Sequence, residues 1–216
     1  SAPIVDTQVL LRAMQYATTF GYALHLQPQD QHLARDGVAH DGEVASRLGL
    51  PGIPAAAESA AIATALELVR ATGARLHFTR ISSAAGIALL QRARDEGLPV
   101  TCDIGVHHLH LTDMDIGYFD SAARFNPPLR AQRDREALSA AAASGLASIC
   151  SDHTPIDEDG KQLPFGEAEA GATALELLLP LTLKWAEAAK LPLPKALARI
   201  TCDPATIIGS HAGHLA

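Results

Sequence analysis

Apolar and polar positions along the chain alternate between the spacings of strands and helices. Strand-length apolar runs lie at 22–27, 75–80, 98–104 and 146–150. Segments with helical spacing lie at 7–19, 55–72, 84–96 and 134–144, and capping residues such as Asp6 and Ser83 precede two of them. Further helices are expected at 172–190, at 194–201 and after Asp203. Four strand and helix alternations predict an α/β protein with a parallel sheet and right-handed crossovers.

The connection from residue 29 to 54 is long and polar. A connection of this length usually marks a functional loop or one that contains short helical pieces. We expect His32 and His40, which it carries, to be surface residues.

The last strand delivers two chemically capable side chains into a loop. Asp152 and His153 follow the apolar run 146–150 and precede Thr154 and Pro155. In α/β proteins the carboxyl end of a strand is the usual place for chemistry, so Asp152 is a candidate metal ligand or general base. The alternative is that Asp152 caps the loop and that His153 is a hydrogen-bonded wall residue. These residues alone leave both readings open.

Composition narrows the class of protein. A net charge of −7 without a basic cluster argues against a nucleic-acid surface, and no apolar stretch reaches the roughly 20 residues that span a bilayer. The three widely separated cysteines form neither a disulfide framework nor a CxxC site. With no basic region before an apolar core at the start of the chain, we expect a cytoplasmic protein.

Four strands cannot close an eight-stranded barrel. The chain is therefore either a small open-sheet protein or the latter half of a (β/α) barrel. Long loops after the carboxyl ends of the strands favour the barrel, because catalytic loops gather on that face.

Several phrases, in order along almost the whole chain, resemble the long-chain bacterial dihydroorotases of the amidohydrolase superfamily. They are PIVDT at 3–7, EVASRLGLPGIP at 43–54, VHHL at 106–109, NPPLR at 126–130, SDHTP at 151–155 and DPA at 203–205. The resemblance implies a zinc-dependent (β/α)8 TIM-type barrel, of which residues 1–216 form a partial domain with strands 5–8. It also implies that the N-terminal half, with its His-x-His ligand pair, and the accessory β-domain lie outside this chain.

Two positions that hold metal-binding histidines in the family differ here. The fifth-strand position holds Gln27, although a two-residue slip could present His25 instead, and the sixth-strand position holds Arg80. A guanidinium has no lone pair to donate and stays protonated, so it repels a divalent cation. The resemblance thus predicts that Arg80 takes the metal's place and pairs with Asp152.

The remaining site positions are partly kept. Asp152 matches the family's eighth-strand aspartate, which is a metal ligand and proton shuttle, but Ile156 replaces a second histidine of the substrate pocket. Asn126 and Arg130 match the substrate-side loop, and His153 is assigned to substrate binding with them. The alternative is that Pro127 and Pro128 only shape a connection. We expect at least one of His107 and His108 to pack structurally.

Three functions follow from the resemblance. The first is a non-catalytic dihydroorotase homologue without zinc in this chain, which forms an oligomer as the structural partner of aspartate transcarbamoylase in pyrimidine biosynthesis. The second is an active zinc-dependent dihydroorotase that hydrolyses the cyclic amide of dihydroorotate to carbamoyl aspartate. The third is an enzyme for another cyclic amide, such as a hydantoin, with Arg80 recognising an anionic substrate.

Overall fold

A four-stranded parallel sheet organises the chain. The computed structural model describes residues 6–214, so only part of the first resemblance phrase, at 3–7, lies within them. The sheet has the order β1-β4-β5-β6, with β1 at Ala23–Leu26, β4 at Arg75–Phe78, β5 at Val100–Gly105 and β6 at Ala147–Cys150. All three pairings are parallel. The predicted α/β alternation is confirmed.

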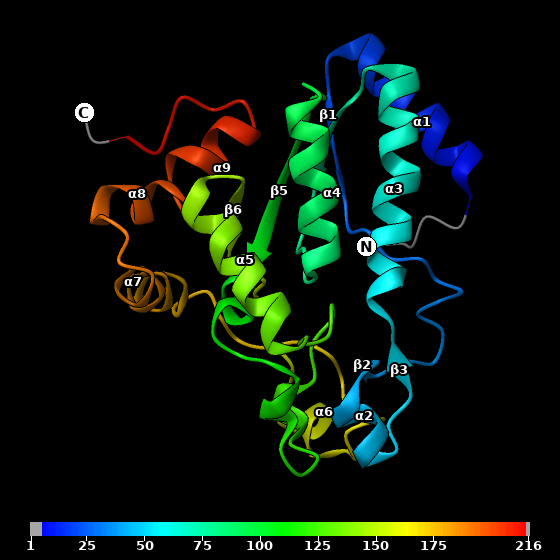
Figure 1. Ribbon diagram of the computed structural model, residues 1–216, viewed down its shortest axis with the longest axis vertical. Helices are drawn as coiled ribbons and strands as arrows, with labels where there is room; N and C mark the ends of the chain where they lie inside the picture. Colours follow the sequence, from blue (N-terminus) through cyan, green and yellow to red (C-terminus); the bar gives the residue numbers. More distant parts are fainter. Residues whose placement is uncertain (1–5, 215–216) are drawn as a thin grey trace.

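Helices connect the strands and cover the sheet. They are α1 at Thr7–Phe20, α3 at Ala55–Thr72, α4 at Ala84–Asp95 and α5 at Gln132–Ser144. Figure 1 shows α3, α4 and α5 side by side in front of the sheet. Asp6 caps α1 by accepting the N–H of Gln8, and Ser83 caps α4 by accepting the N–H of Gly86. The main hydrophobic core lies between these helices and the strands, and includes Phe78, Ile104 and Leu138.

The second half of the long connection before α3 lies in a small lobe at the bottom of Figure 1. It contains β2 at Ala39–His40, α2 at Glu43–Leu48 and β3 at Gly52–Ile53, and β2 pairs with β3 in parallel. The short 3-10 helices η2 at Asp113–Ile116 and η3 at Ser121–Ala123, and α6 at Glu158–Gln162, complete the lobe. A second apolar cluster, which includes Val44, Phe125 and Phe165, holds it together. Of the two alternatives for this connection, the one with a short helical piece is present as α2. The two-residue strands were not predicted.

The C-terminal region differs from the sequence prediction at one helix. Instead of spanning 172–190, α7 runs over Leu178–Ala188, and α8 at Leu193–Ala198 and α9 at Cys202–Ile207 follow it. The prediction for residues 172–177 was wrong because the N–H groups of Ala174 and Leu175 donate to His153 Nδ1, at 3.1 Å each, outside a helical turn. The later start also places Pro180 in the first turn, where a missing N–H is tolerated.

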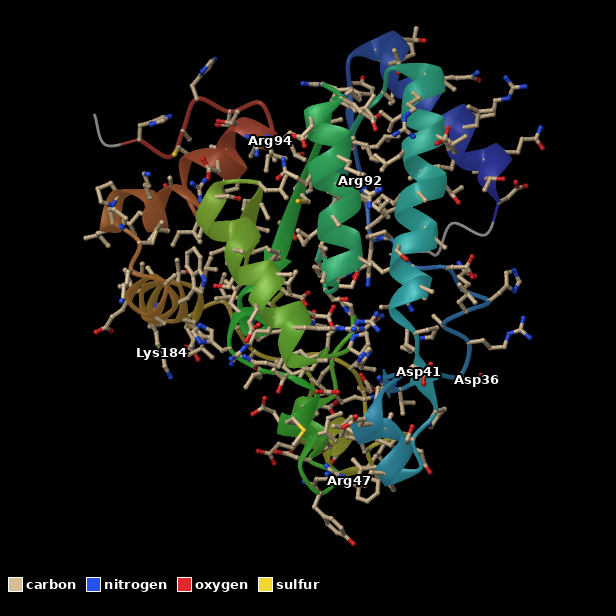
Figure 2. The ribbon with its side chains drawn as sticks, viewed as in Figure 1. Asp36, Asp41, Arg47, Arg92, Arg94 and Lys184 are labelled. Carbon is tan, nitrogen blue, oxygen red and sulfur yellow. The ribbon has the colours of Figure 1, made fainter. Side chains whose placement is uncertain are left out.

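Charged side chains lie mostly on the outside. Figure 2 shows Arg92 and Arg94 on α4, Lys184 on α7 and Arg47 on α2, all of which are exposed. Within residues 6–214, the structure has no helix with the length and apolar character needed to cross a bilayer.

Candidate functional site

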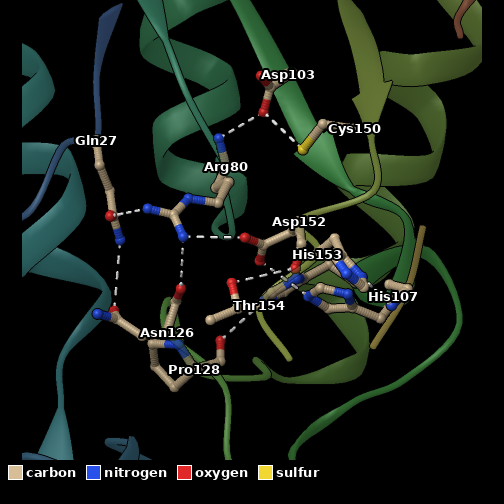
Figure 3. A network of polar contacts seen from close by, with 12 residues as sticks. Gln27, Arg80, Asp103, His107, Asn126, Pro128, Cys150, Asp152, His153 and Thr154 are labelled. Carbon is tan, nitrogen blue, oxygen red and sulfur yellow. Dashed lines mark hydrogen bonds and ion pairs between the residues drawn. The ribbon is translucent and has the colours of Figure 1, made fainter. Parts of the chain in front are cut away.

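Four segments that leave the carboxyl edge of the sheet converge on one guanidinium. Gln27 follows β1, Arg80 follows β4, Asn126 lies in the loop after β5, and Asp152 follows β6. Because parallel strands end at a common edge, residues distant in sequence meet there. Figure 3 shows Gln27, Asn126 and Asp152 gathered around Arg80.

Arg80 donates to oxygen atoms from each of the other three segments. Its Nη1 donates to Asp152 Oδ1 at 3.0 Å and to the carbonyl oxygen of Asn126 at 3.4 Å. Its Nη2 donates to Gln27 Oε1. The ion pair is largely removed from water, with side-chain exposures of 25% for Arg80 and 8% for Asp152. The pairing of Arg80 with Asp152 that the sequence predicts is thus present, and Gln27, not His25, contacts Arg80.

Asp103 fixes the backbone of Arg80 from behind. Its Oδ1 accepts the N–H of Arg80 at 2.7 Å and the thiol of Cys150 at 3.2 Å, while Oδ2 contacts His77 Nε2 at 2.9 Å. Burial raises the pKa of Asp103, but the hydrogen bonds from His77 and the Arg80 N–H outweigh it and hold the pKa below its usual value. Arg80 has φ 58° and Asp152 has φ 48°, the left-handed conformation that non-glycine residues rarely adopt outside functional or strained positions.

His107 lies against the far side of Asp152. Its Nε2 is 3.3 Å from Asp152 Oδ2, but the geometry does not meet that of a hydrogen bond, and both ring nitrogens are buried without a partner. The ring stacks on Phe125 with centroids 4.3 Å apart. Burial, and then the charge of His107, lower the pKa of neighbouring His108 to about 3. His108 therefore packs as a neutral ring, as expected for at least one of this pair.

His153 has a defined tautomer. Because Nδ1 accepts the N–H groups of Ala174 and Leu175, the ring proton of the neutral form resides on Nε2. His153 is exposed, so this N–H is available to donate outward. The hydrogen bonds at Nδ1 match the alternative in which His153 is a hydrogen-bonded wall residue. Substrate binding by His153 stays a prediction.

Arg130, assigned to substrate binding from the sequence, is not brought to the Arg80 cluster. It is 3% exposed, and its guanidinium donates to Ser82 Oγ at 3.2 Å, His40 Nδ1 at 3.1 Å and the carbonyl of Ile53 at 2.6 Å. Glu58 lies behind it and accepts the backbone and hydroxyl groups of both Ser82 and its neighbour. In this half of the barrel Arg130 ties the lobe to the helices.

The surface location expected for His40 was wrong. His40 ends β2 and is buried, and its Nδ1 accepts a hydrogen bond from Arg130. Burial, followed by the charge of Arg130, lowers the pKa of His40. The exposed position of His32 agrees with expectation. Asp103 was not predicted from the sequence as a site residue. The feature of the sequence that could have indicated Asp103 is a carboxylate within a largely apolar strand. Asp103 lies two residues after Thr101, the partner of His77 in the sheet.

The donor set around Arg80 does not fit zinc. Zinc takes imidazole, thiolate and carboxylate ligands, whereas here a fixed cation lies between one carboxylate and two neutral oxygens. Over residues 6–214, no group of three or more His, Cys, Asp and Glu side chains is arranged to hold a metal ion. At positions 27 and 80 the structure thus has a hydrogen-bonded pair of side chains, Gln27 Oε1 and the guanidinium of Arg80.

Solved structures share this half-barrel fold. L-hydantoinase from Arthrobacter aurescens superposes with a TM-score of 0.82 at 23% identity, over 96% of this chain and 48% of the enzyme. Dihydroorotase from Saccharomyces cerevisiae, solved with 5-fluoroorotic acid, superposes with a TM-score of 0.76 at 18% identity, over 94% of this chain and 54% of that one. The fold is that of the TIM-barrel amidohydrolases, of which this chain forms about one half.

Sequence comparison specifies the family. The model of the Dihydro-orotase-like family matches residues 4–85. A dihydroorotase-like protein from Pseudomonas putida is 44% identical over 98% of this chain, and a dihydroorotase from Geobacter sulfurreducens is 35% identical over 99%. The chain spans about half the length of both relatives, at 50% of each. The chain belongs to the dihydroorotase-like family.

Proposed function

We propose that the protein is a non-catalytic member of this family, whose barrel acts as a structural partner of aspartate transcarbamoylase in pyrimidine biosynthesis. The observation that carries the proposal is the ion pair of Arg80 with Asp152, at 3.0 Å. It sets a fixed positive charge against the carboxylate that, by family resemblance, binds metal and transfers the proton.

Chemistry at the site supports the loss of catalysis. A divalent ion at Asp152 would lie close to the guanidinium, and the Coulomb repulsion is large in a partly desolvated site. Gln27 offers an amide oxygen where the family has imidazole, which is a poor zinc ligand. Ile156 also removes an imidazole from the pocket. These changes affect metal binding and substrate contact together.

The names and identities of relatives agree with the proposal. Two proteins named dihydroorotase-like, from Pseudomonas putida and Pseudomonas aeruginosa, are each 44% identical to this chain. Relatives named dihydroorotase, from Geobacter sulfurreducens and Syntrophobacter fumaroxidans, are 35% and 34% identical. Of these four relatives, the two named dihydroorotase-like are thus more similar to this chain than the two named dihydroorotase.

Metal content and turnover of the whole protein test the catalytic part. We expect much less than one zinc per chain by elemental analysis and no hydrolysis of dihydroorotate, with an active dihydroorotase measured in parallel. Stoichiometric zinc together with dihydroorotate turnover would overturn the proposal.

Assembly is tested separately. The whole protein is mixed with purified aspartate transcarbamoylase from the same organism, and the masses are measured by analytical ultracentrifugation. A stable complex of both chains is expected; two independent species at micromolar concentration would remove the partner from the proposal.

An active cyclic amidohydrolase is the alternative, and the retention of Asp152 favours it. Its Oδ2 accepts no hydrogen bond from Arg80 and lies 3.3 Å from His107 Nε2, so this oxygen is the one available to a metal whose other ligands come from the rest of the barrel. This alternative requires a His-x-His pair upstream of this chain. The sequence of that half, with the zinc measurement, separates the two functions.

A further inference from the structure

The guanidinium of Arg80 lies where a single cation can join the loops that leave β1, β5 and β6. It contacts Gln27 after the first of these strands, the Asn126 carbonyl after the second and Asp152 after the third. We propose that Arg80 is an internal structural cation that holds these loops together in place of a metal ion. This role concerns what holds the site together and goes beyond the proposed function.

The acceptors around Arg80 are of the kind that a buried cation needs. They are a carboxylate, a side-chain amide oxygen and a backbone carbonyl, and the planar guanidinium directs separate N–H groups at each. Gln27 Nε2 in turn lies 3.5 Å from Asn126 Oδ1, which links two of the three segments directly. Without the guanidinium, the carboxylate of Asp152, 8% exposed, would remain buried with only the imidazole of His107 beside it, at 3.3 Å.

Asp103 is the positioning residue for this cation. Arg80 adopts φ 58°, a conformation that requires support in a residue with a side chain, and its N–H is held by Asp103 Oδ1 at 2.7 Å. His77 and Cys150 hold Asp103 in turn. The chain of contacts from His77 through Asp103 fixes the direction in which the Arg80 side chain leaves the backbone, and hence its approach to Asp152.

The test measures thermal unfolding of the whole protein with Arg80→Met, with and without EDTA. The matched control is Arg47→Met, which removes an exposed arginine from α2. We expect Arg80→Met to lower Tm by about 5 °C more than the control, because it leaves the buried carboxylate of Asp152 without its positive partner. EDTA should leave the Tm of the unchanged protein where it is, and adding Asp152→Asn to Arg80→Met should recover part of the loss.

Equal effects of Arg80→Met and Arg47→Met, or a similar fall in Tm on adding EDTA to the unchanged protein, would overturn the structural cation. Should Arg80→Met fail to fold, Tm is measured on Arg80→Lys, because lysine keeps the positive charge but lacks the planar guanidinium. We expect a larger fall in Tm than for Arg47→Met, with faster hydrogen exchange at the N–H groups of Asn126, Leu129 and Arg130. No fall and no faster exchange would refute the role of the guanidinium.

The positioning role of Asp103 is tested by a double-mutant cycle. Asp103→Asn should lower Tm more in the protein that has Arg80 than in Arg80→Met, because only the first has a guanidinium to position. Additive losses would mean that Asp103 acts independently of Arg80. These readouts use no turnover, so the structural cation and the proposed function can fail separately.

Discussion

The carboxylate of Glu58 is expected to be among the most sensitive groups in the fold. It is 3% exposed on α3 and accepts the N–H groups of Ser82 and Ser83 at 2.8 and 2.9 Å and both hydroxyls at 2.6 Å. It thereby satisfies N–H groups at the start of α4, where an anion is favoured. Glu58→Gln keeps the shape but turns an amide NH2 toward one of the two serine N–H groups.

The magnitude follows from the groups left unpaired. In Glu58→Gln the hydroxyls of Ser82 and Ser83 can rotate to suit the amide. One serine N–H, however, then faces the amide NH2, so that two donors lack an acceptor, and the negative charge near Arg130 is lost. An unsatisfied buried donor costs about 1–3 kcal/mol, so the two donors together lower the free energy of unfolding by about 3 kcal/mol. Urea unfolding of the whole protein measures it. Glu67→Gln is the control on the same helix, with a side chain 74% exposed and an expected change under about 0.5 kcal/mol. A difference below about 1 kcal/mol between the two variants would refute the capping role.

Three further predictions concern the same fold. Gly86→Ala should destabilise by about 1–3 kcal/mol, although alanine usually favours a helix, because its Cβ would lie 2.5 Å from Glu58 Oε1; unchanged urea unfolding would contradict this. Since the pKa of His108 is lowered to about 3 in the fold, the unfolded chain binds its proton more readily, and stability should fall as pH drops below about 6.5, by up to about 1.4 kcal/mol per pH unit. His108→Gln should flatten that slope in urea unfolding at pH 4 to 7, and an equal slope in both proteins would argue against it. Burial raises the pKa of Asp113, so the folded protein binds this proton more tightly than the unfolded chain does. Asp113→Asn should therefore raise Tm at pH 7 and give no such gain near pH 3. A gain in Tm that is independent of pH would contradict the raised pKa.

Local pattern predicted the sheet and the helices that cover it, because each uses a short-range repeat. The start of α7 escaped prediction, since it depends on bonds from Ala174 and Leu175 to His153, about twenty residues away. Arg130 escaped it for the same reason: its acceptor at Ile53 lies 77 residues earlier, and only the folded lobe brings the two together. Family resemblance identified the positions of Gln27 and Arg80, but the Asp103 support behind Arg80 required the structure.

The residues that stabilise this half of the barrel are largely separate from those at its carboxyl edge. Glu58 and Arg130 join the lobe to α3 and α4, whereas Arg80 and Asp152 join the ends of the strands. A change at Arg80 should therefore affect the ends of the strands without disturbing the network of Glu58 and Arg130. Asp152 is the charged acceptor of Arg80, which gives a physical reason for a carboxylate here whether or not it transfers a proton. Its identity at this position thus follows from burial beside Arg80, and catalysis must be demonstrated independently.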